Sequence, residues 1–310
     1  MRIAVTGAGG MLGSSIMRLV PDAVAVPREI DHFDDERLQE FFLDGRIDTV
    51  IHCAARVGGL AANIRSPIEF FEDNVRLNTA IVRASAAVEI KKFVGILSTC
   101  VYPREEFVKY PLTEDQLHVG PPHDSNFGYA YAKRMLEVEC RSYRQQRGAN
   151  FITVIPNNMY GPYDNFSRED SHVVPALMLR FFEAQLHGHD TVSVWGSGRQ
   201  EREFTYVDDV SKAIMWLVEH YDGGSPVNVG NTTQVKLSDL VSVIADVVGF
   251  KGTVQYQSDM PEGQLRKPSS IELLRSLGYS GEFVSLRAGV VSTLEYLKRH
   301  YPIIRGFTQQ

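Results

Sequence analysis

Short apolar runs alternate with longer segments of helical periodicity through the first half of the chain. The apolar runs have the length of strands and cover residues 3–6, 23–26, 48–55, 92–98 and 151–155. Apolar positions recur every three or four residues, which predicts amphipathic helices over residues 11–20, 66–88 and 129–146. Strands that alternate with helices are typical of an α/β fold, so we predict a parallel, doubly wound sheet of the Rossmann type.

The pattern changes after Pro156, where turn-forming residues dominate positions 157–166. A loop is expected at residues 195–198, and residues 202–209 are expected to open a helix with Asp208 or Asp209 as its N-cap. Residues 171–175 are expected to lead into a helix that continues to about Gln185, and further helices are predicted over 237–248 and over 286–299.

These patterns divide the chain into two expected parts. The first is a dinucleotide-binding domain of residues 1–163, to which a segment of about residues 202–225 returns. The second is a smaller α/β substrate-binding lobe, which covers about residues 164–201 and 226–310.

The first predicted strand ends in a glycine-rich turn, and a helix follows. In such a unit Gly7 permits the tight turn, Gly10 lets a pyrophosphate approach the backbone and Gly13 lets the helix pack closely. The helix N-terminus offers amide groups and the positive end of its dipole to the phosphate. An ordinary glycine-rich turn is the alternative, but the complete strand–turn–helix context favours a dinucleotide site.

The end of the second predicted strand bears on the choice between NAD and NADP as cofactor. An NAD site usually ends its second strand with an acidic residue on the ribose, whereas this strand ends in Pro27 and Arg28. Arg28 could pair with a 2′-phosphate, which favours NADP(H). Glu29 and Asp31 follow closely, and a solvated Arg28 on a loop is the alternative.

A serine, a tyrosine and a lysine form the clearest catalytic pattern. Ser98 stands where the strand over 92–98 ends, and Tyr129 and Lys133 are spaced to share one face of a helix. A nearby ammonium favours the phenolate, which would make Tyr129 a proton donor and acceptor near neutral pH. The Ser98 hydroxyl could hold the same carbonyl oxygen.

Composition and charge narrow the function. The 310 residues are 44% hydrophobic and 23% charged, with a net charge of −6 and scattered basic residues, so we expect no nucleic-acid partner. No apolar stretch is long enough to span a membrane and no signal peptide is evident. Cys53, Cys100 and Cys140 have no metal-binding spacing, so we expect no metal and a reduced, cytoplasmic location.

The chain resembles the extended short-chain dehydrogenase/reductases and, among them, the GDP-L-fucose synthase family, nearly from end to end. The matching segments are Gly7-x-x-Gly10-Met-x-Gly13, Ala54-Ala-Arg-Val-Gly-Gly59, Ser98-x-Cys100-x-Tyr-Pro103, Tyr129-x-x-x-Lys133, Tyr160-Gly-Pro-x-Asp-Asn-Phe166, Ser171-His-Val-x-Pro-Ala176, Trp195-Gly-Ser-Gly198, Arg202-Glu-Phe204 and Arg266-Lys267. The alanine-rich segment and the Ser-His-Val segment are far more specific than the glycine turn.

The resemblance implies an activity and a division of roles. It implies an NADPH-dependent 3,5-epimerase/4-reductase of a GDP-4-keto-6-deoxy sugar, which works as a homodimer built from two helices of each protomer. The implied catalytic residues are Ser98, Tyr129 and Lys133 for reduction, with Cys100 as the epimerase base and His172 as its acid. The implied cofactor-binding residues are Gly7, Gly10, Met11, Leu12, Gly13, Arg28, Ala54, Ala55, Lys133, Pro156, Asn158, Met159 and His172. The implied substrate-binding residues are Ser98, Thr99, Cys100, Tyr129, Asn158, Arg180, Trp195, Arg202 and Lys267.

Each role has a plainer alternative. Cys100 could be a small buried hydrophobe, His172 a loop or cap histidine, and Arg180 a surface side chain. A related enzyme that reduces a GDP-4-keto-6-deoxyheptose without epimerisation would carry the same motifs. A 4,6-dehydratase is disfavoured because no carboxylate stands beside Ser98, and a non-catalytic sensor would have no need of Tyr129 and Lys133.

Overall fold

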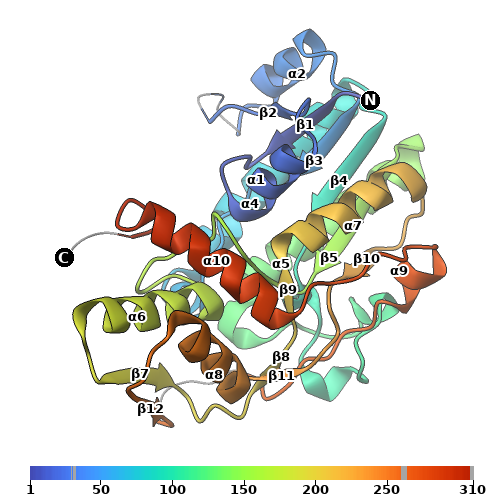
Figure 1. The fold of residues 1–310 in the computed structure, drawn as a ribbon. Coiled ribbons are helices and arrows are strands. Elements are labelled where there is room, and N and C mark those ends of the chain that lie inside the picture. The colour runs from blue at the N-terminus through green and yellow to red at the C-terminus, as the bar shows by residue number, and fades with distance from the viewer. Residues whose placement is uncertain (29, 31–32, 260–263, 308–310) are drawn as a thin grey trace.

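A six-stranded parallel sheet organises the computed structural model, which describes residues 1–28, 30, 33–259 and 264–307. Glu29 and Asp31 lie outside the described residues. The strand order is β10-β5-β4-β3-β1-β2 (Figure 1). The strands are β1 (Ile3–Thr6), β2 (Val24–Ala25), β3 (Thr49–His52), β4 (Lys92–Ile96), β5 (Phe151–Pro156) and β10 (Val227–Val229).

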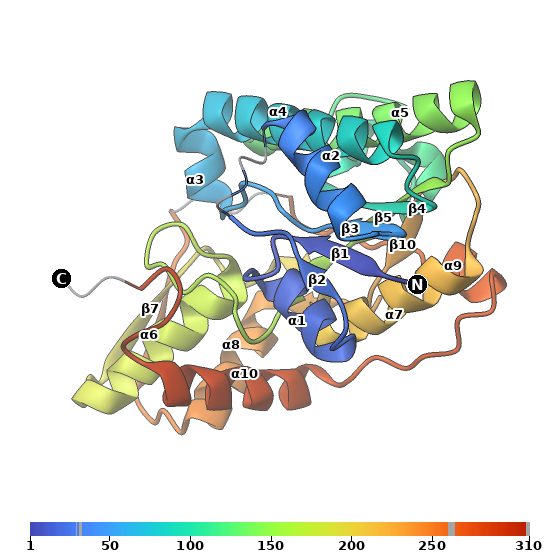
Figure 2. The same cartoon turned by 90° about the horizontal axis from the view of Figure 1, so that it is seen from above.

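Helices cover both faces of this sheet. One face carries α2 (Asp35–Asp44), α4 (Pro67–Ala87) and α5 (Phe127–Arg147), and the other carries α1 (Met11–Leu19) and α7 (Val207–His220) (Figure 2). Successive side chains of a strand point to opposite faces, so Ala4 joins the core under α4 while Val5 joins the core under α1. Both faces are therefore buried, and the predicted doubly wound α/β fold is confirmed.

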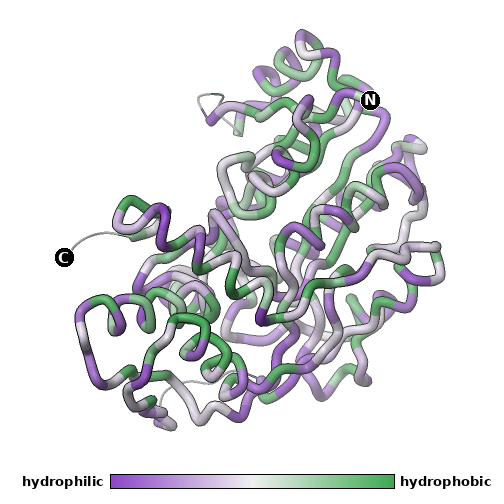
Figure 3. The backbone as a smooth tube through the Cα atoms, in the orientation of Figure 1, coloured by the Kyte–Doolittle hydropathy of each residue, from purple (hydrophilic) through white to green (hydrophobic). Residues whose placement is uncertain are grey.

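A second core lies in the C-terminal half. It is built by α6 (Val173–His187), α8 (Leu237–Val248) and α10 (Leu286–His300), together with the parallel pair of β7 (Thr191–Trp195) and β12 (Thr253–Gln257). Hydrophobic and hydrophilic residues alternate along these helices (Figure 3), and the apolar ones, such as Phe181, Leu240 and Leu294, meet in the centre. The lobe thus stabilises itself by burying its own apolar faces.

Two short strand pairs lie where the chain passes between the sheet and the lobe. In the first, β6 (Asn158–Tyr160) runs parallel to β9 (Phe204–Tyr206). In the second, β8 (Glu201–Arg202) runs antiparallel to β11 (Val235–Lys236). The chain also forms two short helices, α3 (Leu60–Arg65) and α9 (Glu272–Ser276).

The structure differs from the expected division of the chain in one place. Residues 226–310 were expected in the lobe, yet β10 extends the large sheet by pairing with β5. Leu274 of α9 and Tyr279 also pack into the core beneath α7. A third pass of the chain therefore belongs with the sheet, in which β10 is the edge strand beside β5.

The expected cap of α7 is also wrong. The helix begins at Val207 with Tyr206 in the N-cap position and no side-chain cap, so Asp208 and Asp209 lie in its first turn. The Asp208 carboxylate accepts hydrogen bonds from Ser15 (2.6 Å) and Arg18 (2.7 Å) of α1, which ties the two helices together.

The expected loop at 195–198 begins one residue later, because Trp195 is the last residue of β7. No helix in the described ranges has the length and apolar character needed to cross a bilayer.

Candidate active site

The glycine turn between β1 and α1 forms one wall of the site. Gly7 has a φ of +64°, and a Cβ there would lie 2.7 Å from the backbone nitrogen of Ala54. A Cβ on Gly13 would lie 2.2 Å from the Gly7 carbonyl oxygen, so α1 packs directly against the turn. No side chain caps α1 at Gly10, and its first-turn amides therefore face the space in front of the turn. This arrangement fits the phosphates of a dinucleotide.

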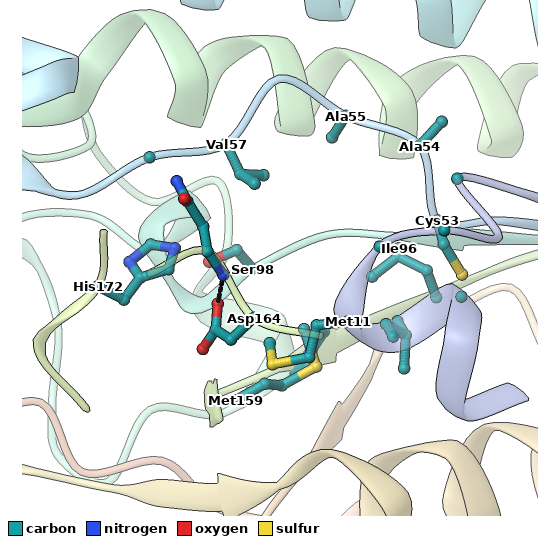
Figure 4. A pocket seen from close by; sticks show the side chains of 18 of the residues that line it. Met11, Cys53, Ala54, Ala55, Val57, Ile96, Ser98, Met159, Asp164 and His172 are labelled. Atoms are coloured by element: carbon teal, nitrogen blue, oxygen red, sulfur yellow. Dashed lines mark hydrogen bonds between the residues drawn. The ribbon is translucent and has the colours of Figure 1, made fainter. Parts of the chain in front are cut away.

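The glycine turn opens into a cavity of about 610 Å³, which we call the glycine-turn cavity. Every residue expected to bind the cofactor lines it: Gly7, Gly10, Met11, Leu12, Gly13, Arg28, Ala54, Ala55, Lys133, Pro156, Asn158, Met159 and His172. Figure 4 shows Ser98, His172 and Asp164 grouped at one end of this cavity, with Cys53 and Ala54 towards the other. The Arg28 guanidinium lies 3.9 Å from the position of a Cβ on Gly9, beside the turn.

A second cavity of about 760 Å³ lies towards the lobe, and we call it the lobe cavity. Every residue expected to bind the substrate lines it: Ser98, Thr99, Cys100, Tyr129, Asn158, Arg180, Trp195, Arg202 and Lys267. Ser98, Tyr129, Asn158 and His172 line both cavities. The proposed reacting groups therefore gather where the two cavities meet.

Two neighbouring residues of α5 fix the segment that carries Ser98. The ammonium of Lys133 donates to the carbonyl oxygen of Ile96, the last residue of β4, at 2.8 Å. The Arg134 guanidinium donates to the carbonyl oxygen of Val101 at 2.7 Å. Ser98 and Cys100 lie between these two anchors, in a 3₁₀ turn over Thr99–Val101. Their positions are thus set by α5, the same helix that presents Tyr129.

Burial controls the protonation of the tyrosine and the lysine. Lys133 is 2% exposed, and its burial lowers the pKa of the ammonium to about 8, so it remains a cation at neutral pH. Its Nζ lies 5.8 Å from the centre of the Tyr129 ring. Burial nevertheless raises the pKa of the Tyr129 phenol, and a Cys100 thiolate would raise it further. The expected phenolate is therefore absent in the protein alone, and Tyr129 is held in its proton-donating form.

The Cys100 thiol is buried beside several cations. Burial raises its pKa, while a hydrogen bond with Ser98 and the charges of Lys267, Lys133 and Arg134 oppose that rise. The Cys100 amide also donates to the Ser98 hydroxyl oxygen, at 3.5 Å. The neighbours reduce the rise in pKa but do not reverse it, so the thiol is the main form at neutral pH.

His172 occupies the N-cap position of α6, which was one of its plainer alternatives. Its imidazole makes no capping hydrogen bond, however, and lines both cavities instead. Desolvation by the surrounding protein lowers the pKa of the His172 imidazole, so the neutral form predominates at pH 7.

Arg180, Arg202 and Lys267 are among the cationic residues that line the lobe cavity. The Arg180 guanidinium lies 5.6 Å from the centre of the Trp195 ring and donates to the Ser193 carbonyl oxygen at 3.3 Å, so the Arg180 side chain lies along β7. Burial, together with the charge of nearby Arg202, lowers the pKa of the Lys267 ammonium to about 8. This concentration of positive charge fits an anionic ligand such as a diphosphate. Within the described ranges no group of three or more His, Cys, Asp or Glu side chains could hold a metal ion.

Three residues with no expected role also contact the site. Glu203, which is 2% exposed, lines the lobe cavity and accepts hydrogen bonds from the Ser269 amide (2.8 Å) and hydroxyl (2.6 Å). Asp164 and Arg305 line the glycine-turn cavity. Glu203 and Asp164 stand inside matching motifs, which was the available signal, whereas nothing in the sequence pattern marked Arg305.

Comparisons with known proteins agree with this geometry. The model of the NAD dependent epimerase/dehydratase family matches residues 3–230. A GDP-L-fucose synthase of Escherichia coli is 36% identical, with 98% of this chain and 99% of that protein covered. A GDP-L-fucose synthase of Sinorhizobium fredii is 35% identical, with 95% and 94% covered.

Solved structures give the same result. A GDP-L-fucose synthetase of Naegleria fowleri bound to NADP superposes with a TM-score of 0.89 at 30% identity, covering 98% of this chain and 96% of that one. A GDP-6-OMe-4-keto-L-xylo-heptose reductase of Campylobacter jejuni shares the fold, with a TM-score of 0.88 at 23% identity over 96% and 97% of the two chains. Because the family model covers most of the chain and the synthases match it nearly from end to end, the chain belongs to the NAD dependent epimerase/dehydratase family, as a relative of the GDP-L-fucose synthases.

Proposed function

We propose that this chain is an NADPH-dependent enzyme that epimerises carbons 3 and 5 of a GDP-4-keto-6-deoxy sugar and then reduces its 4-ketone, giving GDP-L-fucose. The observation that carries the proposal is the junction of the two cavities, where Ser98, Tyr129 and His172 line both and Cys100 lies beside them. A cofactor in one cavity and a sugar in the other would meet at these groups. The relatives named GDP-L-fucose synthase support the choice of sugar.

The cofactor has a site with suitable chemistry. The glycine turn would hold the diphosphate, Arg28 the 2′-phosphate, and Lys133 the ribose next to the nicotinamide. Bound NADPH supplies the hydride for carbon 4. The N. fowleri relative that binds NADP supports this cofactor. The location that we propose is the cytoplasm.

Epimerisation requires a base on one face of the sugar ring and an acid on the other. In the proposed step the Cys100 thiolate takes the proton from carbon 3 or 5, and the electron pair moves to the 4-keto oxygen. Ser98 and Tyr129 donate hydrogen bonds to that oxygen, which stabilises the enolate. The minority imidazolium form of His172 then gives a proton to that carbon from the opposite face and becomes neutral, and transfer of a proton from the Cys100 thiol back to His172 through solvent restores both groups. The charges of Lys267 and Lys133, which oppose the rise in the Cys100 pKa, make this minority thiolate accessible.

Reduction uses the same oxygen but a different donor. When carbon 4 receives the hydride, the Tyr129 phenol would give its proton to the 4-keto oxygen. Ser98 would donate a hydrogen bond to the same oxygen. The pKa of Tyr129 is raised by burial, so the proton is present when it is needed. The Lys133 ammonium beside the ring stabilises the phenolate that forms.

Two substitutions separate the two steps. Tyr129→Phe should lower the rate of reduction about 100-fold or more, the usual scale for a positioned acid, while exchange of solvent deuterium into carbons 3 and 5 survives better. Cys100→Ala should abolish exchange and leave slow oxidation of NADPH by the unepimerised sugar. Nuclear magnetic resonance of the product sugar and NADPH absorbance measure the two outcomes.

Cys140→Ala is the matched control, because Cys140 is also buried but lines neither cavity. It should leave exchange and reduction unchanged. If Cys100→Ala exchanges deuterium at the wild-type rate, Cys100 is a packing residue and the epimerase part of the proposal fails.

One observation favours a second candidate, a GDP-4-keto-6-deoxyheptose 4-reductase without epimerisation. Burial raises the pKa of Cys100, so the thiol form would be a poor base if no ligand changed its surroundings. The product of the wild-type enzyme decides between the two functions, because the second leaves the configuration at carbons 3 and 5 unchanged.

A further inference from the structure

The glycine turn has no cation of its own. Residues 7–13 are Gly-Ala-Gly-Gly-Met-Leu-Gly, so only backbone amides and the dipole of α1 face a phosphate there. A helix N-terminus is equivalent to roughly half a positive charge, which is less than a diphosphate carries. Arg28 follows β2, beside Gly9, where we place the 2′-phosphate. Any cationic side chain at the diphosphate would therefore come from elsewhere in the chain.

The C-terminal segment brings an arginine to this position. Arg305 lies five residues beyond the end of α10, at the far end of the chain from the turn (Figure 1). It lines the glycine-turn cavity, and its Nη1 is 3.7 Å from the position that a Cβ would take on Gly10. Gly10 is the N-cap residue of α1, so the guanidinium lies next to the amides that face the phosphate.

The position of Arg305 is held by the lobe. Its carbonyl oxygen accepts a hydrogen bond from the Phe166 amide at 2.9 Å, and the preceding Ile304 is buried in the core with α10. Its Nη1 donates to the Tyr163 carbonyl oxygen at 3.1 Å. A guanidinium has five N–H donors, so this bond leaves donors for an anion in the cavity.

We propose that Arg305 binds the diphosphate of NADP(H), as the cation that the glycine turn lacks. The inference rests on the cofactor of the proposed function and not on the sugar. A planar guanidinium beside the N-terminus of α1 can give two parallel hydrogen bonds to phosphate oxygens. The segment that packs with the lobe then contributes directly to the cofactor site formed by the sheet.

Nucleotide fragments test this assignment by binding rather than by turnover. The ligands are NADP⁺, 2′-phospho-ADP-ribose and 2′-AMP, which has no diphosphate, and calorimetry measures each Kd. Arg305→Gln should raise the Kd of the two diphosphate ligands about 10-fold or more and leave that of 2′-AMP unchanged. Arg28→Gln should instead raise the Kd of 2′-AMP. Arg299→Gln, on an exposed residue of α10 that lines neither cavity, should change none of them.

The same measurements can overturn the proposal. An unchanged Kd for NADP⁺ in Arg305→Gln would show that Arg305 does not contact the diphosphate. An equal loss of affinity for 2′-AMP would show that Arg305 has a structural role. If the glutamine variant does not fold, Arg305→Lys decides, since lysine keeps a donor for Tyr163 but loses the paired bonds: a several-fold weaker diphosphate ligand supports the proposal and no change refutes it. A wild-type chain that binds no NADP⁺ would refute the proposed cofactor and this proposal together.

Discussion

At the residue scale, burial has a larger effect than neighbouring charge on the groups that line the cavities. Tyr129, Cys100 and Lys133 all have pKa values shifted towards their neutral forms, and desolvation is the main cause for each. A phenol and a thiol kept neutral retain their protons until a ligand arrives. The site is thus prepared to donate a proton to a ketone, while abstraction of a proton depends on the cations around Cys100.

Asp164 gives the clearest test of such burial. It is 4% exposed, one carboxylate oxygen has no hydrogen-bond partner, and burial raises the pKa of the carboxyl to about 7. The Asn165 amide and the charge of Arg305 oppose this rise. Because the folded-state pKa exceeds the ordinary value of 3.8, the contribution of this carboxyl to stability should be most favourable below pH 4 and should become less favourable as the pH rises towards 7.

We predict that Asp164→Asn stabilises the protein more at pH 8 than at pH 5, by roughly 2–3 kcal/mol, because the uncharged amide has no ionisation penalty. Urea unfolding at the two pH values measures the difference. Asp22→Asn, at an exposed position, should shift stability equally at both. Equal shifts for Asp164→Asn would show that Arg305 keeps the buried carboxylate ionised.

The sequence could predict which residues line the cavities wherever a motif fixes them locally. Gly7, Gly10 and Gly13 are set by one turn, and Tyr129 and Lys133 by one helix. Arg305 could not be found in this way, because its place beside Gly10 depends on how α10 and the Phe166 segment pack. Protonation was equally out of reach, since the pKa values depend on burial that only the folded chain creates.

At the element scale, short strands were the hardest to predict. β7 and β12 pair although some 60 residues separate them along the chain. β6 and β9 pair across a separation of about 45 residues. Strands of three to five residues carry little periodicity of their own. The long helices α4, α5, α8 and α10 were predicted to within a few residues, because their apolar faces repeat over several turns.

Glu203 shows how one element positions another. It precedes β9, and its carboxylate accepts hydrogen bonds from Gln234 and from the amide and hydroxyl of Ser269. Lys267 lies two residues before Ser269, on the segment that this carboxylate holds. The position of Lys267 in the lobe cavity therefore depends on the contact between Glu203 and Ser269.

We predict that Ser269→Ala weakens binding of GDP several-fold while binding of NADP⁺ is unchanged. The substitution removes a bond of 2.6 Å to a buried carboxylate, which typically contributes about 1.5–3 kcal/mol, and so frees the segment that carries Lys267. Calorimetry with each nucleotide separates the two cavities. Ser276→Ala, at an exposed position of α9, is the control, and an unchanged Kd for GDP in Ser269→Ala would mean that Glu203 has no part in substrate binding.

At the scale of the whole molecule, exposed apolar side chains gather on two neighbouring helices of the described chain. It lies on α4 and α5, and we call it the α4/α5 surface: its exposed members are Ile68, Phe71, Phe127, Tyr131, Met135 and Val138. The members on α5 recur at helical spacing, so they form one stripe. The two helices touch at their N-terminal ends, where a Cβ on Gly128 would lie 2.5 Å from the Pro67 carbonyl oxygen. The six side chains therefore lie on two adjoining helices, and exposed apolar side chains gathered in this way mark an interface more often than a free surface.

We predict that this surface joins two copies of the chain, with α4 and α5 of each protomer packed against those of its partner. A twofold arrangement lets the same stripe cover itself, and the resemblance noted from the sequence implies the same assembly. Sedimentation at micromolar concentration should give twice the chain mass of 34.8 kDa. Met135→Glu should give the monomer, because a carboxylate in the centre of the stripe would be buried without a partner. Leu186→Glu, which charges an exposed apolar residue of α6 instead, should remain dimeric. A wild-type monomer at this concentration would leave the α4/α5 surface unexplained and would contradict the homodimer.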